Sequence, residues 1–395
     1  MAKPLDGLKV IDLTRVLAGP FSTMLLADMG ADVIKIENPK GGDDSRAFGP
    51  FKEGLSAYYI SLNRSKRSVT LNLKEERARE ILKKLVEKAD VLVENYKPGT
   101  MKKLGLDYDA LKTVNPRLIY AAASGYGQTG PYSSKAAYDL ILQGMSGFMS
   151  ITGFDAEHPV KAGSSIADVF TGVFTAVGIL AALEHRNKTG QGQMIDVAML
   201  DCMISTLENA FATFDCSGKS PRPIGNVHRS IAPFASFPTS DGLVNVCAGN
   251  DDLWHRFCDV VGMKEYATDA RFAGNKARVE NFGELYEIIA AHTSKRTTDE
   301  WVKALDAVQV PCGPILNIEQ VVNDPQVKAR DMIMELEHPE NGKFMVPGVP
   351  IRFSKTPASI KSFAPALGEH NFEVYGELLG LNREEVEALH NGGII

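Results

Sequence analysis

The chain has 395 residues, of which 44% are hydrophobic and 23% are charged. This is the composition of an ordinary globular protein, and it excludes a disordered chain, a fibrous chain and a miniprotein held together by disulfide bonds. Lys and Arg number 43 against 49 Asp and Glu, a net charge of −6, which argues against a broad nucleic-acid-binding surface.

Strand-like and helix-like segments alternate over the first 122 residues. Short β-like runs follow stretches in which apolar residues recur with helical spacing, and this alternation predicts an α/β fold with a mostly parallel sheet covered on both faces. We expect strands at 8–13, 32–37, 67–73, 91–94 and 118–122, and helices at 21–29, 76–88 and 106–114.

A long helix rich in small residues is predicted from residue 164 to the C-cap signal at Gly190. Its apolar stretch, 169–183, is shorter than the roughly 18 residues of a membrane span, so we expect no membrane segment. The N-terminus lacks the apolar core of a signal peptide, and the five cysteines and eight histidines show no metal-ligand spacing. We therefore expect a cytoplasmic protein with reduced cysteines and no metal.

The second half of the chain contains the clearest boundary signal, a segment at 217–230 that is rich in Gly, Pro and Ser. A helix is expected before it, at 196–213. After it, two strands around a turn at 240–242 and three amphipathic helices predict a smaller α+β domain. We predict a large domain over 1–216, a small domain over 217–330, and a segment over 331–395 that returns to complete the large domain.

The segment SGYGQTGP at 124–131 matches the pattern G-x-G-x-x-G and follows a predicted strand. A dinucleotide-binding fingerprint requires a helix to begin at once, whereas Pro131 and the residues after it continue as a loop. We interpret the segment as a glycine-rich turn, with a dehydrogenase as the weaker alternative.

A better place for a nucleotide-like ligand is the turn between the first strand and the first helix. Pro20 is expected at the first helical position, which leaves free backbone N–H groups for phosphate. Two basic clusters, at 63–67 and at Lys97 with Lys102 and Lys103, favour an anionic ligand, although solvated lysines explain each cluster equally well.

Asp168 is the candidate catalytic residue. It lies near the start of the apolar helix, where it either complements the helix dipole or serves as a nucleophile that attacks an acyl carbonyl. Tyr138 and Asp139 either contact substrate or start a helix. His228 and Arg229 either hold a carboxylate or cap a turn.

An ordered series of motifs runs nearly from end to end of the chain and resembles the class III (family III) coenzyme A transferases. The motifs include VIDLTRVLAGPFSTMLLADMGADVIKIE, NRSKRSVTLNLK, VLVENYKPG, NPRLIYAAASGYGQTGP, AYDLILQGMSG, SSIADVFTGV and LGEHNFEVYGELLGLNREEVEALH. GGDDSRAFGPF and GKSPRPIGNVHRSIAPF are most similar to the formyl-CoA or acetyl-CoA:oxalate transferases.

The resemblance implies that Asp168 attacks the donor acyl-CoA and forms an aspartyl anhydride, then an aspartyl-CoA thioester, and then a second anhydride with the acceptor carboxylate. It implies oxalate as the leading acceptor, with other dicarboxylates as alternatives. Backbone N–H groups of a glycine loop in the small domain would stabilise the oxyanions. This chain has only Gly225 and Asn226 in that loop, and His228 follows it.

The resemblance also implies the residues that bind coenzyme A, which is a substrate here rather than a tightly bound cofactor. The matching positions are Arg15, Val16, Ala18, Leu71, Lys74, Asn95, Tyr96 and Lys103. The chain departs from the family at Asn38 and Ala136, where relatives carry basic residues. Leu17 replaces a glutamine that contacts the acyl group, so the acyl end of the pocket is expected to be more apolar.

The family fold is a Rossmann-like large domain with a small domain, in a homodimer of interlocked rings. Its partners would be acyl-CoA and carboxylate substrates, not nucleic acid or membrane. Two alternatives are an α-methylacyl-CoA racemase-like enzyme and a non-catalytic CoA-binding protein. Tyr138 stands where the racemases have a histidine base, which argues against the first. The presence of Asp168 argues against the second.

Overall fold

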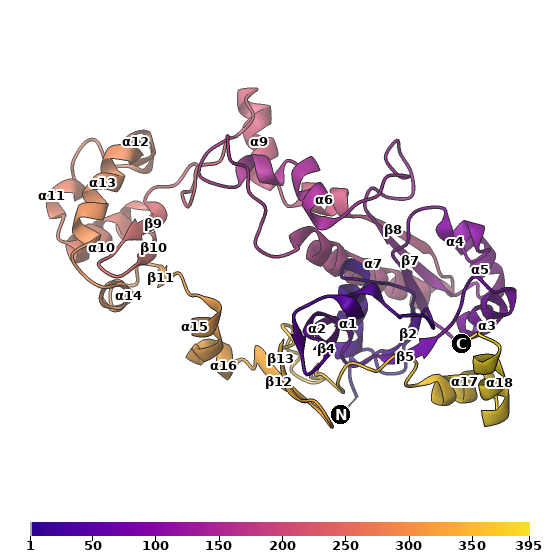
Figure 1. Ribbon diagram of the computed structural model, residues 1–395. Coiled ribbons are helices and arrows are strands. Elements are labelled where there is room, and N and C mark those ends of the chain that lie inside the picture. The colour runs from indigo at the N-terminus through magenta and orange to yellow at the C-terminus, as the bar shows by residue number, and fades with distance from the viewer. Residues whose placement is uncertain (1) are drawn as a thin grey trace. The chain divides into compact units, whose positions relative to one another are not determined.

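The computed structural model describes residues 2–395 and divides into two compact units (Figure 1). The large unit comprises Met1–Met149, Lys161–Ser220 and Gln326–Ile395, and the small unit comprises Ser150–Val160 and Pro221–Pro325. The predicted boundaries lie within a few residues of 220/221 and 325/326. The prediction did not include residues 150–160, which the structure assigns to the small unit.

The centre of the large unit is a six-stranded sheet, and all of its strand pairs are parallel, as predicted. The strands lie in the order β5 (Arg67–Thr70), β2 (Asp32–Glu37), β1 (Lys9–Asp12), β6 (Val91–Glu94), β7 (Ile119–Ser124) and β8 (Met194–Ala198). Read as ranks along the chain, this is the doubly wound order 3-2-1-4-5-6, which reverses direction between β1 and β6. The reversal opens a crevice at the carboxyl ends of those two strands.

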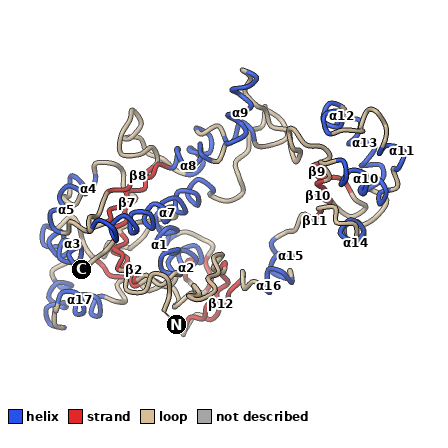
Figure 2. Tube along the Cα trace, turned by 180° about the vertical axis from the view of Figure 1, so that it is seen from behind, coloured by secondary structure: helices blue, strands red, loops and turns tan. Residues whose placement is uncertain are grey.

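Helices cover both faces of this sheet because successive strand residues point to opposite sides. On one face, Val10, Val33 and Val91 pack with Leu26 of α1 (Ala18–Asp28) and Ile179 of α7 (Ile166–Thr189). On the other face, neighbouring strand residues pack with α3 (Glu76–Glu87) and α5 (Tyr108–Val114). Figure 2 shows these helices around the strands.

Two predictions for this unit were wrong. Residues 196–213 are not one helix but strand β8 followed by α8 (Met199–Ser205) and α9 (Glu208–Ser217), because the backbone of 194–198 pairs with β7. Pro20 is the third residue of α1, which begins at Ala18, and not the first.

Helix α7 is 24 residues long, close to the predicted range, and ends at the predicted C-cap Gly190. By length and composition the whole helix is apolar enough to cross a membrane, although the apolar stretch at 169–183 is shorter than a span. One side of the helix is buried against α1 and β7 in the core of the large unit. Its small residues permit this close packing, which is typical of a core helix in a globular protein.

The last part of the chain returns to the large unit and covers the edge strand β5. There, helix α17 (Asn371–Leu379) binds the backbone of Thr70. Asn371 Oδ1 accepts a hydrogen bond from Thr70 N at 2.9 Å, and the hydroxyl group of Tyr375 donates one to Thr70 O at 2.6 Å. Helix α18 (Arg383–Asn391) and a hairpin of β12 (Ile333–His338) and β13 (Gly342–Pro347) belong to the same segment. The hairpin packs on α2 (Ala57–Asn63).

The small unit has a three-stranded antiparallel sheet in the order β11 (Cys312–Pro314), β10 (Leu243–Cys247) and β9 (Phe234–Pro238). Trp254 and Phe257 of α10 (Asp251–Val261) and Trp301 of α14 (Thr298–Asp306) are buried in its core. The other helices of this unit are α11 (Lys264–Ala267), α12 (Asn275–Glu280), α13 (Phe282–Thr293) and α15 (Ile318–Asn323).

The remaining short elements of the large unit are the 3-10 helices η1 (Asp44–Ala47) and η2 (Phe148–Ile151), strands β3 (Phe51–Lys52) and β4 (Leu55–Ser56), and helices α4 (Thr100–Lys103), α6 (Asp139–Met145) and α16 (Pro325–Ala329). Helices η2 and α16 extend over the unit boundaries. Of these elements, η1, α4 and α6 bear on the site below.

Candidate active site

A cavity of about 300 Å³ lies at the carboxyl ends of β1, β6 and β7 in the large unit. Ligands of doubly wound folds bind at this position, where the strand order reverses. The segments that line the cavity are 15–18, 95–98, 123–125 and 135–138, together with Asp168 and Met199.

Asp168 reaches this cavity from the third position of α7, in the first helical turn. Burial and, as the smaller cause, the nearby charge of Asp139 together raise the pKa of its carboxyl group to about 7. A carboxylate that is poorly solvated and lies in a cavity at a helix N-terminus is a competent nucleophile once it is ionised.

Asp139 fixes the start of helix α7. Its Oδ1 accepts a hydrogen bond from Ala167 N at 3.0 Å, and its Oδ2 accepts one from Gln143 Nε2 at 2.7 Å. The amide oxygen of Gln143 in turn accepts from Ala162 N at 2.8 Å. Helix α6 thus holds two residues that precede Asp168 in the chain. Asp139 both positions the nucleophile and raises its pKa through charge repulsion.

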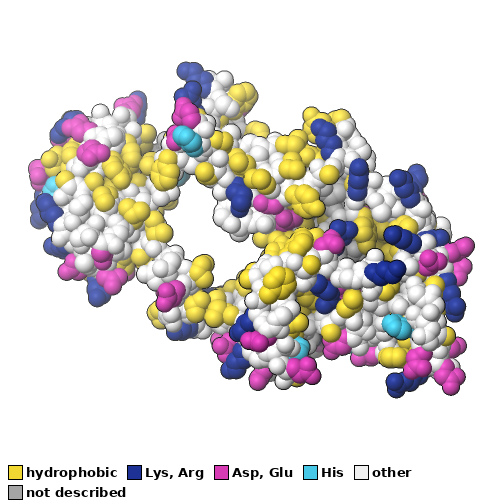
Figure 3. All heavy atoms as spheres, in the orientation of Figure 1, with side chains coloured by type: hydrophobic (Ala, Val, Ile, Leu, Met, Phe, Trp, Pro, Cys, Tyr) yellow, Lys and Arg dark blue, Asp and Glu magenta, His cyan; other side chains and the backbone are white. Residues whose placement is uncertain are grey.

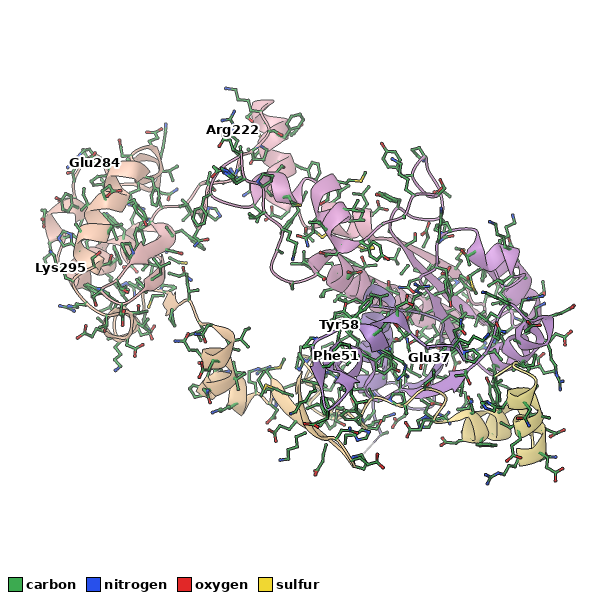
Figure 4. All side chains as sticks on the ribbon, viewed as in Figure 1. Glu37, Phe51, Tyr58, Arg222, Glu284 and Lys295 are labelled. Carbon is green, nitrogen blue, oxygen red and sulfur yellow. The ribbon has the colours of Figure 1, made fainter. Side chains whose placement is uncertain are left out.

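The pKa of Tyr58 on α2 is affected by the charge of Asp168. The sequence analysis did not identify Tyr58 as a candidate residue. Burial, followed by the charges of Asp168 and Asp43, raises the pKa of Tyr58 to about 12, so its hydroxyl group remains protonated and can donate a hydrogen bond. Figure 4 labels Tyr58 in the large unit. The sequence of α2, AYYISLN, contains no charged residue and no recognised motif that would point to Tyr58.

The opposite wall of the cavity is the turn between β1 and α1. Asn95 holds this turn through two hydrogen bonds: its Oδ1 accepts from Arg15 N at 2.9 Å, and its Nδ2 donates to Arg15 O at 2.8 Å. The Arg15 guanidinium forms an ion pair with Asp44. Beyond the turn, the first N–H groups of α1 are at the cavity.

Most of the predicted site residues meet in this one cavity. Leu71 and Lys74 do not line it but follow β5 at the same sheet edge, and Lys103 ends α4. The residues that do line it are Arg15, Val16, Leu17, Ala18, Asn95, Tyr96, Tyr138 and Asp168. Tyr138 is 71% exposed and precedes α6 as its N-cap.

Lysines also reach the cavity. Lys97 lines it, and so does Lys135, which the sequence reasoning missed. Its position next to Ala136, where relatives carry a basic residue, was the available signal. Figure 3 shows further Lys and Arg side chains on the large unit around α4, where Lys102 and Lys103 lie. These cations suit the phosphates of a nucleotide-like ligand.

Both interpretations of the basic cluster at 63–67, a site for an anionic ligand and a group of solvated cations, are wrong. Lys66 is fully buried and pairs with Asp12 at 3.0 Å, while Arg64 pairs with Asp28 at 2.8 Å. Arg67 binds Asp32 at the sheet edge. These charges are neutralised inside the unit and leave no cation for a ligand.

Gly225, Asn226 and His228 belong to the small unit. The N–H of Gly225 donates to Gly153 O at 2.8 Å, and His228 N donates to Phe234 O at 3.0 Å. Gly225 also has φ +67°, in the region that favours glycine. Their part in catalysis stays a prediction, and an oxyanion bound by Gly225 would have to displace the Gly153 carbonyl.

Within residues 2–395, no group of three or more His, Cys, Asp or Glu side chains could hold a metal ion.

Comparisons with known proteins identify the family of this chain. The family model described as CoA-transferase family III matches residues 5–371. The chain is 46% identical to a succinate–glutarate CoA-transferase of Agrobacterium fabrum, over 96% of this chain and 97% of the relative. It is 45% identical to an acetyl-CoA:oxalate CoA-transferase of Acetobacter aceti, over 89% of each.

A solved structure described as a CAIB/BAIF family protein from Brucella suis has 42% sequence identity and a TM-score of 0.86, covering 96% of this chain and all of that one. The resemblance inferred from the motifs is confirmed, and the protein is an enzyme of the transferase class. The chain belongs to CoA-transferase family III.

Proposed function

We propose that this enzyme moves coenzyme A from an acyl-CoA donor to a small dicarboxylate, with Asp168 as the nucleophile. The observation that carries the proposal is the position of Asp168, in the first turn of α7 and facing the cavity at the carboxyl ends of β1, β6 and β7. An ionised aspartate at that place has an acyl carbonyl within reach when the substrate fills the cavity.

The reaction balances without an added proton or metal. Asp168 Oδ attacks the thioester carbonyl and the C–S bond breaks, which gives a mixed anhydride and the CoA thiolate. The thiolate attacks the Asp168 carbonyl, releases the donor carboxylate and leaves an aspartyl-CoA thioester. The acceptor carboxylate then displaces the thiolate to form a second anhydride. Attack of the thiolate on the acceptor carbonyl gives the new acyl-CoA and restores Asp168.

Each of these attacks passes through a tetrahedral oxyanion that needs N–H donors. In the large unit, Ala18, the first residue of α1, lines the cavity, and its backbone N–H is at the positive end of the helix dipole. The glycine loop around Gly225 is the donor that the family resemblance implies. Lys97, Lys135 and Lys103 are placed to take the CoA phosphates, with Asn95 and Tyr96 along the carrier.

Our proposal for the acceptor is based on the substrates named for similar proteins. A succinate–glutarate transferase and an acetyl-CoA:oxalate transferase are similar to the chain at nearly equal identity, and the former over a larger share of the chain. We propose a C4 or C5 dicarboxylate as the first acceptor to test, and oxalate as the second. Leu17 makes the acyl end of the cavity apolar, which suits a methylene chain better than oxalate.

We further propose a homodimer in the cytoplasm. Several large apolar side chains of the large unit are exposed in the single chain, including Val177 of α7 and Phe211 and Phe214 of α9, each more than half exposed. Large apolar side chains that are exposed in the single chain are available for an interface with a second copy.

The test is mass spectrometry of the protein incubated with succinyl-CoA and then with glutarate, oxalate, mesaconate or acetate. We expect a covalent CoA adduct on the peptide that contains Asp168, and a new acyl-CoA with at least one dicarboxylate. Asp168→Ala should lose the adduct and all transfer while it still binds CoA. An unchanged rate in Asp168→Ala would remove this residue from the mechanism. Exchange of an α-methylacyl-CoA proton with deuterated water, without transfer, would establish the racemase alternative.

A further inference from the structure

The turn that carries Arg15 to Ala18 into the cavity has an unusual backbone. Val16 has φ +69°, in the left-handed region that β-branched residues rarely adopt. Such a conformation is strained and persists only where the surrounding structure enforces it. The turn must therefore be held by contacts strong enough to offset this strain.

Side chains from other strands supply those contacts, and they bind consecutive backbone groups of the turn. Lys35 Nζ donates to Thr14 O at 2.8 Å. Asn95 takes both backbone groups of Arg15, as described above. Asp43 Oδ1 accepts from the N–H of Val16 at 3.1 Å. The strained residue is thus fixed at its own N–H and at the two residues before it.

Lys35 and Asp43 are also bound to each other. Their ion pair has an Nζ to Oδ2 distance of 2.8 Å, and the two side chains are 0% and 1% exposed. Asp43 is held further by Ser45, whose N–H and hydroxyl donate to Oδ1 at 2.9 and 2.8 Å. Lys35 comes from β2, and Asp43 precedes η1. One buried pair therefore connects β2, η1 and the cavity turn.

A buried ion pair contributes little net stability compared with apolar residues of similar volume, because both charges lose their hydration. The geometry here gives the pair a different task. Besides their mutual ion pair, each of the two side chains forms a hydrogen bond with the turn. Lys35 binds Thr14, which precedes Arg15, and Asp43 binds Val16, which follows it.

We propose that the Lys35–Asp43 pair is the positioning device of the CoA-binding turn. It forces Val16 into the left-handed conformation that presents Arg15, Leu17 and Ala18 to the cavity. The inference rests on the proposed function, because it assumes that this cavity binds an acyl-CoA. Neither Lys35 nor Asp43 lines the cavity, so both act through the turn and not on the substrate.

The experiment compares two variants in which a buried pair is removed without leaving one charge unpaired. Lys35→Met/Asp43→Asn removes the proposed device. Arg64→Met/Asp28→Asn removes a second buried pair of the same unit, with side chains 2% and 1% exposed, that does not contact the turn. Melting curves establish that both variants fold, and titration calorimetry with CoA measures binding apart from turnover.

We expect the first variant to bind CoA about tenfold more weakly and to show a matching rise of KM for acyl-CoA, with kcat changed much less. The control variant should lose stability but keep its CoA affinity. Equal CoA affinities in the wild type and the first variant would overturn the positioning role. If the wild-type protein itself bound no CoA, the proposed function would fail instead.

A rescue separates positioning from general damage. Val16→Gly removes the strain, because glycine adopts positive φ without a steric penalty. Introduced into the Lys35→Met/Asp43→Asn background, it should recover part of the lost CoA affinity. If Val16→Gly gave no recovery or a further loss, the pair would not be acting through the Val16 conformation.

Discussion

Gly172 of α7 lies directly against Ala18 of α1: a Cβ atom at position 172 would be 2.8 Å from the carbonyl oxygen of Ala18. The same atom would be 2.9 Å from the Cβ of Phe21. Gly172 is one helical turn after Asp168, and Ala18 ends the turn that lines the cavity. The absence of a side chain at this position therefore lets the nucleophile and the CoA-binding turn approach each other.

Gly172→Ala should push α7 away from α1, because the Ala18 carbonyl is backbone and cannot rotate aside. We expect a loss of about 1–3 kcal/mol in the free energy of unfolding and a fall in kcat, since Asp168 moves with the helix. Urea denaturation and initial rates measure the two effects. Gly283→Ala in α13 is the control, because its added Cβ meets nothing within 4 Å; a similar loss there would contradict the steric reason.

The pH dependence of transfer should report the ionisation of Asp168. The nucleophile must be negatively charged, and burial raises its pKa to about 7. At pH values below that pKa the carboxyl group is protonated, so kcat/KM for acyl-CoA should rise with pH and level off above about 7. Initial rates over the range from about pH 5 to pH 9 measure the profile. A flat profile would mean that another step limits the rate or that Asp168 is ionised throughout.

Asp139→Asn should move this profile to lower pH. The substitution removes a negative charge that raises the pKa of Asp168, while the amide Oδ1 can still accept from Ala167 N and hold the start of α7. Asp139→Ala is the comparison, because it removes both the charge and the hydrogen bond and should also lower the melting temperature. If Asp139→Asn left the midpoint of the profile unchanged, the charge coupling between the two carboxyl groups would be negligible.

Arg229 offers a test of acceptor recognition in the small unit. It lines a cavity of about 270 Å³ with His228 and apolar neighbours, and no carboxylate partner of Arg229 is found among the ion pairs of residues 2–395. A guanidinium in an apolar cavity suits the second carboxylate of a dicarboxylic acid. Arg229→Gln should raise KM for the dicarboxylate and leave KM for acyl-CoA unchanged.

The control for this experiment is Arg222→Gln. The Arg222 side chain is exposed, is labelled in Figure 4 and does not line that cavity. Its backbone carbonyl accepts a hydrogen bond from the Arg229 guanidinium, and the substitution leaves that carbonyl in place. Loss of acceptor affinity in both variants would point to overall surface charge. An unchanged acceptor KM in Arg229→Gln would exclude the cavity from acceptor binding.

The sequence was sufficient where a local pattern decided the structure. Strands β2 and β6 occur at the predicted residues because their apolar runs are bounded by clear turn signals. The sequence was insufficient where residues far apart in the chain determined the local structure. Strand β8 forms because its backbone pairs with β7. The 63–67 cluster was misinterpreted because its cations are neutralised by distant carboxylates: Asp12 is 54 residues from Lys66, and Asp28 is 36 residues from Arg64.

The site follows the same rule. Asp168 stood out as a lone acid at the start of an apolar helix, and the cavity turn followed from the strand–helix alternation. Tyr58, which lies on α2 and not in the cavity wall, carries no sequence signal for its electrostatic interaction with Asp168. The Lys35–Asp43 pair joins residues of β2 and of the loop before η1, and only the folded structure brings them together.

The cover on strand β5 has a consequence for synthesis of the protein. The backbone N–H of Thr70 donates to Asn371 and its carbonyl accepts from Tyr375, and the ribosome adds both residues about 300 residues later, after the whole small unit. Until then, the nascent chain presents an unpaired edge strand, which is the kind of surface that pairs with other chains. Co-translational folding of this enzyme therefore has a long interval of aggregation risk, and chaperone demand should fall sharply once residue 375 has left the exit tunnel.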